Sequence, residues 1–158
     1  MKKIPTLILK FAIIIFGLTV LALSIYWLPW QANVLEQMYP EFAHLKYPLL
    51  IGIYLTALPF FFALYQGYRL LQLIDKNSAF SNLAVLALNR INVCAILISS
   101  LYVVGFIILN IEGAQNPGIL LIGIIITFLS IVIATFAIVL KNICNKAIDI
   151  KAANDLLV

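Results

Sequence analysis

Four long apolar stretches alternate with short polar segments along this chain. The clearest covers residues 118–140, has no charged residue, and has hydroxyl side chains only at Thr127, Ser130 and Thr135. At about 1.5 Å of rise per residue, a helix over this stretch crosses a hydrocarbon layer about 30 Å thick. A soluble domain of this size has no need of a helix that is apolar on every face. The pattern therefore predicts a membrane span.

The same pattern predicts three more spans, over about 11–30, 47–68 and 91–110. The first stretch is longer than the apolar region of a signal peptide and has no small-x-small cleavage site before Gln31, so we expect it to stay as a span. Pro59 is expected to kink the second span, and Thr56 to satisfy the carbonyl that the proline frees. The predicted fold is all-α, a four-helix transmembrane bundle in one domain over residues 1–158.

The polar segments between the spans show helical periodicity in several places. Segment 31–46 has apolar residues at helical spacing and is interrupted by Pro40. The second helix is expected to continue to Ile74 and turn at Asp75-Lys76-Asn77-Ser78, with Ser78 or Ser81 as the next N-cap. After Lys141, one apolar seam continues through Leu140, Ile143, Ala147 and Ile150. Helices 2, 3 and 4 are thus predicted to extend past the membrane, through amphipathic segments 69–90 and 141–158.

Charge supports this layout and predicts its orientation. Charged residues make up 10% of the chain, against about 25% in soluble proteins. Of ten Lys and Arg residues, all but Lys46 lie on the side of the membrane that holds both chain ends. Because Lys and Arg in short loops stay in the cytoplasm, we expect both termini to be cytoplasmic. The basic residues flank the apolar stretches, which favours contacts with anionic lipid over direct binding of nucleic acid.

Residues that carry chemistry are almost missing from the spans. No Asp or Glu lies inside a predicted span, His44 is the only histidine and lies in an outer loop, and Cys94 and Cys144 form no CxxC pair. Catalysis and ion-coupled transport in a membrane need such groups at fixed positions. We therefore expect no enzyme activity, no catalytic residue, no metal site and no cofactor.

Polar, small and aromatic residues within the spans suggest helix packing. Ser99 and Ser100 are candidates for hydrogen bonds between helices. Ser130 and Ala134, with Ala137 close by, offer a small-residue face for close approach to a neighbouring helix. The aromatic residues Tyr54, Phe61 and Tyr65 share one face of the second span. That stripe is more typical of helix packing, but it is also a candidate intramembrane ligand surface.

The two amphipathic segments on the inner side are the remaining candidate for a function. Together they would form a small basic and apolar platform for a soluble cytoplasmic protein. The simpler interpretation is that they pack on each other and on lipid. Arg90, at the entry of the third span, would then only reach the lipid headgroups.

Two motifs of this chain resemble a bacterial membrane family, domain of unknown function 2975. The inner loop Asp75-Lys76-Asn77-Ser78-Ala79-Phe80-Ser81-Asn82 is similar to that family's Phe-Ser-x-x-Asn approach to the third helix. The segment Lys151-Ala152-Ala153-Asn154-Asp155-Leu156 resembles its Lys-Glu-Glu-Asn-Asp-Leu-Thr close. Departures from the pattern are Ala152 and Ala153 in place of acids, Leu157 in place of Thr, and an early Asn82.

The resemblance implies a multi-pass protein of the bacterial inner membrane, often encoded beside a small Cro/CI-type helix-turn-helix regulator. By analogy, we expect a membrane tether or modulator of such a regulator. The candidate partner surface consists of Phe80, Arg90, Asn154, Asp155 and Leu156. The alternative is a small transporter or immunity-type protein for a hydrophobic compound, which would use Tyr54, Phe61 and Tyr65. A helper subunit of a larger complex and a homo-oligomer also stay open.

Overall fold

The computed structural model describes residues 3–114 and 117–157. Its first long helical segment, called the first rod below, consists of three consecutive helical pieces. These are α1 (Lys3–Ala22), the π-helical turn η1 (Leu23–Trp27) and α2 (Leu28–Met38). Pro29 has no backbone N–H for the i−4 bond, and just before it the N–H of Leu28 donates to the carbonyl of Leu23, five residues back. The rod therefore contains the predicted span 11–30 but continues to Met38, into the segment expected to be a polar connection.

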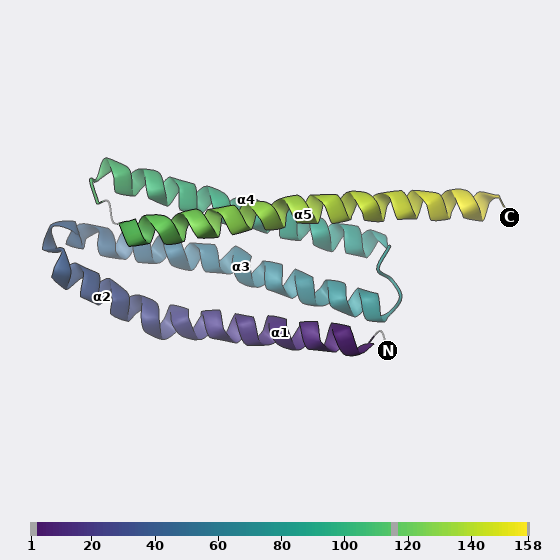
Figure 1. The fold of residues 1–158 in the computed structure, drawn as a ribbon, viewed down its shortest axis with the longest axis horizontal. Coiled ribbons are helices and arrows are strands. Elements are labelled where there is room, and N and C mark those ends of the chain that lie inside the picture. Colours follow the sequence, from purple (N-terminus) through teal and green to yellow (C-terminus); the bar gives the residue numbers. More distant parts are fainter. Residues whose placement is uncertain (1–2, 115–116, 158) are drawn as a thin grey trace.

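The first connection is a tight helical corner at the predicted outer end of the molecule, opposite the chain termini (Figure 1). The 3₁₀-helix η2 (Pro40–Leu45) separates α2 from α3 (Lys46–Asp75), so Pro40 interrupts the helix as predicted. Lys46 fastens the corner, since its Nζ donates to Glu36 Oε2 at 2.8 Å and to Asn33 Oδ1 at 2.5 Å. Lys46, the only Lys or Arg residue predicted on the side of the membrane opposite the chain ends, thus holds α2 against the start of α3.

Pro59 lies inside α3, which continues past it as one α-helix. The expected role of Thr56 is wrong in detail. Its Oγ1 donates to the carbonyl of Ile53 at 2.6 Å, three residues back, and not to Leu55, whose carbonyl lacks an N–H partner at Pro59. Thr56 bonds locally because a short hydroxyl side chain reaches only the carbonyls of the preceding turn.

The turn between α3 and α4 (Asn82–Ile111) forms as predicted. α3 ends at Asp75, and Asn77 takes a left-handed conformation with φ 58°, which asparagine tolerates better than most residues. Ser81 is the N-cap of α4, and its hydroxyl accepts the N–H of Ala84 at 3.3 Å. After the second outer turn, α5 (Pro117–Leu156) forms one helix of 40 residues.

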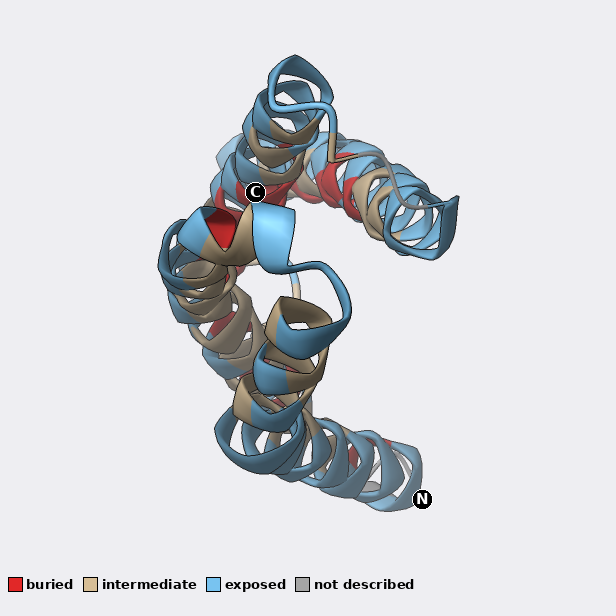
Figure 2. Cartoon of the chain, turned by 90° about the vertical axis from the view of Figure 1, so that its left-hand side faces the viewer, coloured by how far each residue is buried: buried red, intermediate tan, exposed pale blue. Residues whose placement is uncertain are grey.

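The long helices lie side by side in chain order, as a curved and open row. Neighbouring helices pack together, most extensively α4 with α5 and α3 with α4, whereas α1 contacts α3 less and has no comparable contact with α4 or α5 among the described residues. Figure 1 shows both chain ends on the same side, with α5 projecting well past the other helices. In the end-on view of Figure 2 the row curves, and the buried residues lie between neighbouring helices.

Small side chains form the contact between α4 and α5. Ser130, Ala134 and Ala137 are all buried, which confirms the predicted close-approach face. The prediction for Ser99 and Ser100 is wrong, because Ser99 donates to the Ala95 carbonyl of its own helix and Ser100 is exposed. The bond between helices comes from Asn92 instead, whose Nδ2 donates to the Ala134 carbonyl at 2.7 Å.

The exposed surface of the four long helical segments is apolar, as expected for a protein surrounded by lipid. Four helical segments are long and apolar enough to cross a bilayer: Ile4–Met38, Pro40–Asp75, Asn82–Ile111 and Pro117–Leu156. In the most apolar window of the first segment no residue is buried inside the protein. A chain with so much exposed Leu, Ile and Phe can keep its surface only when lipid covers it. The predicted all-α, four-span membrane fold is confirmed.

Candidate functional site

The turn 78–81 lies against the beginning of the predicted segment 141–158, on the side of the molecule that holds both chain ends. The Cys144 thiol contacts the carbonyl oxygens of Ala79 at 3.6 Å and Ser81 at 3.8 Å. Cys144 is buried in a cluster with Leu73 and Ala84. These contacts place the neighbouring Phe80, which is 60% exposed, beside α5.

Past this cluster, the last two turns of α5 have no packed neighbour in the described structure. Ile148 is the last α5 residue that packs against the cluster, and every residue from Asp149 to Leu157 is exposed. We call residues 149–157 the α5 tip. Figure 1 shows it beyond the ends of the other helices.

The predicted apolar seam points away from the protein. Ile143 and Ile150 are exposed, and the α5 face that packs inward carries Ala137, Cys144 and Ile148 instead. The seam continues to Leu157, since Ile143, Ala147, Ile150, Asn154 and Leu157 are spaced 4, 3, 4 and 3 residues apart. This is the spacing of a coiled-coil heptad. An unpaired heptad seam on a projecting helix can receive a helix from another protein.

The structure does not bring the predicted partner surface together in one place. Asn154, Asp155 and Leu156 are exposed on the α5 tip, whereas Phe80 is exposed on the turn beside Cys144, ten residues or about 15 Å back along α5. Arg90 is half-buried in a groove between α3 and α4. Sequence reasoning missed Leu157, although its place in the seam could have been found by continuing the spacing past Ile150.

The groove around Arg90 is mainly apolar and has a volume of about 410 Å³. Beside Arg90, Asn89 accepts a hydrogen bond from Lys141 Nζ at 3.1 Å, which brings a second positive charge to this position. No carboxylate lines the groove, and no ion pair of Arg90 occurs within the described residues. The lining comes from two helices: Leu58, Pro59 and Phe62 of α3, and Asn89, Arg90, Val93, Cys94 and Leu97 of α4.

The aromatic stripe of α3 packs mainly on the first rod. The Tyr54 hydroxyl donates to the Ser24 carbonyl at 2.7 Å, across to η1. Phe61 packs edge-on against Phe60 and lies close to Gly17 of α1. Tyr65 is exposed. The structure therefore places two of the three residues in helix packing, and none of them lines the groove around Arg90.

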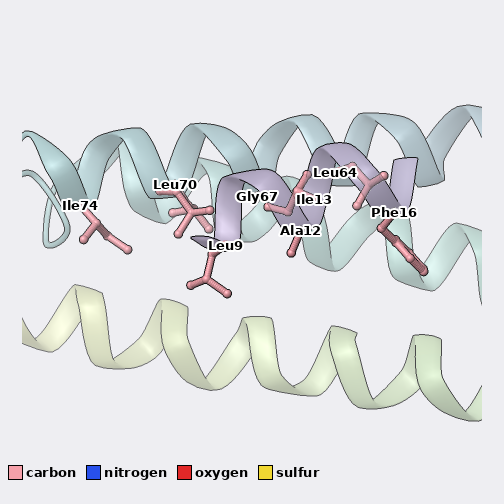
Figure 3. A pocket seen from close by; sticks show the side chains of 9 residues that line it. Leu9, Ala12, Ile13, Phe16, Leu64, Gly67, Leu70 and Ile74 are labelled. Atoms are coloured by element: carbon pink, nitrogen blue, oxygen red, sulfur yellow. The ribbon is translucent and has the colours of Figure 1, made fainter. Parts of the chain in front are cut away.

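A second groove lies between α1 and α3 and is apolar throughout (Figure 3). Its volume is about 560 Å³, and its side chains carry only carbon atoms. Such a lining has no group that could orient a ligand, so lipid chains would fill it without selectivity. The lining residues are Leu9, Ala12, Ile13, Phe16, Leu64, Gly67, Leu70, Leu71 and Ile74.

A polar contact between the first and second spans was not predicted. Lys10 Nζ donates to Asp75 Oδ2 at 2.6 Å, and the Thr6 hydroxyl donates to the other carboxylate oxygen. The same ammonium lies 5.6 Å from the ring centroid of Tyr68. The sequence contains a signal for this pair, because the opposite charges of Lys10 and Asp75 lie at the same end of two successive spans. The pair was not predicted because Asp75 was expected to lie in the turn after the second helix and not to contact the first span.

The other ionisable residues form no cluster. His44 Nε2 lies 3.1 Å from Glu112 Oε2 and links the two outer turns. Cys94 and Cys144 are free and buried. Across the described residues, no three His, Cys, Asp or Glu side chains come together where they could hold a metal ion.

Comparisons with known proteins identify the relatives of this chain. Over its full length the chain is 46% identical to the uncharacterized membrane protein YoaS of Bacillus subtilis (strain 168), and the match also covers the whole of that protein. No solved structure matches the chain significantly. The family model described as "Protein of unknown function (DUF2975)" matches residues 30–158. The match includes the 75–82 loop, the Arg90 groove and the α5 tip, and the chain therefore belongs to the DUF2975 family of proteins.

Proposed function

We propose that this chain is a non-enzymatic, multi-pass protein of the bacterial cytoplasmic membrane that holds a soluble regulator protein at the inner surface. The observation that carries the proposal is the exposed heptad seam of the α5 tip, where Ile150 is 69% and Leu157 is 85% exposed. Exposed apolar side chains on a helix that projects past the membrane are costly in water. A partner helix would cover them.

The composition of the tip favours a protein partner over lipid. The tip carries Asp149, Lys151 and Asp155 around its seam, and the resulting net negative charge disfavours contact with anionic lipid headgroups. Asn154 occupies a seam position, where a polar residue fixes the register of paired helices at some cost in stability. A short helix–helix contact with a defined register suits reversible capture of a partner.

The kind of partner is proposed from the family resemblance. The resemblance implies a gene often placed beside that of a small Cro/CI-type helix-turn-helix regulator, which would be a soluble cytoplasmic protein. The orientation proposed from the Lys and Arg distribution places the α5 tip in the same compartment. Membrane capture would keep the regulator away from DNA, or present it to a second membrane protein.

The decisive experiment is co-expression with the neighbouring regulator, followed by separation of membranes from the soluble fraction. We expect the regulator to sediment with membranes that contain the intact chain and to stay soluble when residues 154–158 are deleted. Leu157→Asp should release it to a similar degree, because the charge replaces an apolar side chain at a seam position. A regulator that stays soluble with the intact chain would refute the tether.

Ala152→Asp provides the matched control. It adds the same charge to the same exposed helix but lies off the seam, so the regulator should remain with the membranes. If Ala152→Asp and Leu157→Asp release the regulator equally, the contact depends on charge alone and the seam is not the binding surface.

The alternative, a transporter or immunity-type protein for a hydrophobic compound, has less support. It would require Tyr54, Phe61 and Tyr65 to face a common cavity, and two of them pack on the first rod. The two ideas remain separable by mutation. A carrier would lose function when the stripe is substituted and would tolerate loss of the α5 tip, whereas a tether would respond in the opposite way.

A further inference from the structure

Arg90 lies at the entry of the third span and has no ion pair within the described residues. It is half-buried in the groove between α3 and α4, and no carboxylate lines that groove. A cation in this position normally pairs with a carboxylate or reaches the headgroups. The acidic residue nearest along α3, Asp75, already binds Lys10.

The groove has two chemically different ends. Arg90 and Asn89 lie at the end nearer the turn 76–81, and Lys141 contacts Asn89 there. The rest of the groove is formed by Leu58, Phe62 and Leu97 together with Pro59, Val93 and Cys94, which extend toward the middle of the spans. A positive end followed by an apolar channel complements an anionic head followed by a hydrocarbon chain.

The groove is large enough for one hydrocarbon chain. Pro59 is among its lining residues, and a proline ring is shorter than a leucine or phenylalanine side chain. The volume of about 410 Å³ lies in the range of about 300–1,000 Å³ typical of small-molecule sites. The space suits one acyl chain lying along α4.

We propose that this groove binds a bilayer lipid with an anionic phosphate headgroup, with the headgroup on Arg90 and Lys141 and one acyl chain along Phe62, Val93 and Leu97. Arginine binds phosphate through two parallel hydrogen bonds, and basic pockets between membrane helices are known to hold anionic headgroups. The proposal does not depend on the tether, because it uses a different surface and a different ligand.

The test is retention of lipid by the full-length chain in detergent micelles, followed by native mass spectrometry. Phosphatidylglycerol and phosphatidylcholine with identical acyl chains are the probes. The wild-type protein should keep phosphatidylglycerol in preference to phosphatidylcholine, and Arg90→Gln should reduce that preference about tenfold. Equal retention of the two lipids by the wild type would overturn the proposal.

Two further variants separate a specific site from general surface charge. Lys146→Gln removes one positive charge from an exposed position of α5 outside the groove, and it should leave the preference unchanged. Val93→Trp fills the groove without altering charge and should lower retention of phosphatidylglycerol. If Lys146→Gln acts as strongly as Arg90→Gln, or if Val93→Trp has no effect, the groove is not the lipid site.

Two additional measurements cover misfolding and small anions. The midpoint of thermal unfolding of each variant should stay close to that of the wild type, which shows that the variant is folded. Arg90→Lys keeps the positive charge and should therefore retain part of the preference for phosphatidylglycerol that Arg90→Gln loses. Millimolar inorganic phosphate should displace little lipid, because it cannot occupy the apolar channel. Full displacement by phosphate would mean that the site binds a free anion, which would also overturn the proposal.

Discussion

Two buried amides show how differently similar residues behave inside these helices. Asn92 Nδ2 donates to the Ala134 carbonyl at 2.7 Å and joins α4 to α5. Gln66 on α3 is 1% exposed, and its Oε1 has no partner among the described residues. A buried amide with a partner contributes net stability, whereas one without a partner only loses its hydration.

This contrast predicts opposite effects of the same kind of substitution. Asn92→Leu should lower the stability of the folded helix row by about 1 kcal/mol, because it removes a hydrogen bond between helices. Gln66→Leu, the matched comparison, should leave stability unchanged or raise it. The measurement is thermal unfolding in detergent micelles, followed by maleimide labelling of the buried Cys94 and Cys144. An Asn92→Leu protein with the wild-type midpoint would contradict the role given to this bond.

At the scale of whole elements, α1 is the helix held least by packing. It packs chiefly on α3, and an apolar groove separates the two helices along part of their contact. The Lys10–Asp75 pair and the Thr6 hydroxyl add polar contacts that join the N-terminal part of α1 to the end of α3. Both charged side chains are about one-fifth exposed, so water screens the ion pair only in part.

Breaking the ion pair should loosen α1 without unfolding the other helices. Lys10→Met removes a charged hydrogen bond of about 1.5–3 kcal/mol. The test uses a disulfide between cysteines introduced at Ile13 and Gly67, where a Cβ on residue 67 would lie 3.7 Å from Ile13 Cδ1. Disulfide formation should slow severalfold in Lys10→Met, while Lys151→Met, with the same loss of charge on the α5 tip, should keep the parental rate. Equal rates in all three proteins would show that packing alone holds α1.

At the scale of the molecule, the row is asymmetric between its two ends. One end holds both chain ends, the turn 76–81 and the α5 tip, and the other holds the two predicted outer connections (Figure 1). His44 and Glu112 link those connections, and Lys46 fastens the first of them. Outside the apolar stretches, the end with the chain termini carries nearly all the cationic side chains.

This asymmetry predicts a single orientation in the membrane. Reporter fusions at either chain end should be active as cytoplasmic reporters, and a reporter inserted at Gly113 should be active only outside, because Lys and Arg resist translocation. Lys46→Gln, which removes the one basic residue of the opposite side, should keep this orientation. Alkaline phosphatase activity from a fusion at residue 158 would place the α5 tip outside and would exclude the proposed regulator contact.

The apolar stretches alone determined that this is an all-α protein with four membrane spans, because backbone polar groups in lipid must be satisfied within each segment. Part of the local chemistry was predictable too, as the Ser81 cap, the break at Pro40 and the small-residue face at Ser130, Ala134 and Ala137 show. Such features depend only on neighbours in sequence or on helical spacing.

Only the tertiary structure decided which faces meet. Lipid is as apolar as the side chains, so hydrophobic periodicity does not reveal which side of a span contacts another span. The sequence therefore did not show that Asn92 would bond α5, that Lys10 would reach Asp75, or that Arg90 would enter a groove away from Phe80. The sequence also could not show that no other helix of the chain would cover the seam of α5. This depends on where α3 and α4 end relative to α5, which is the longest helix.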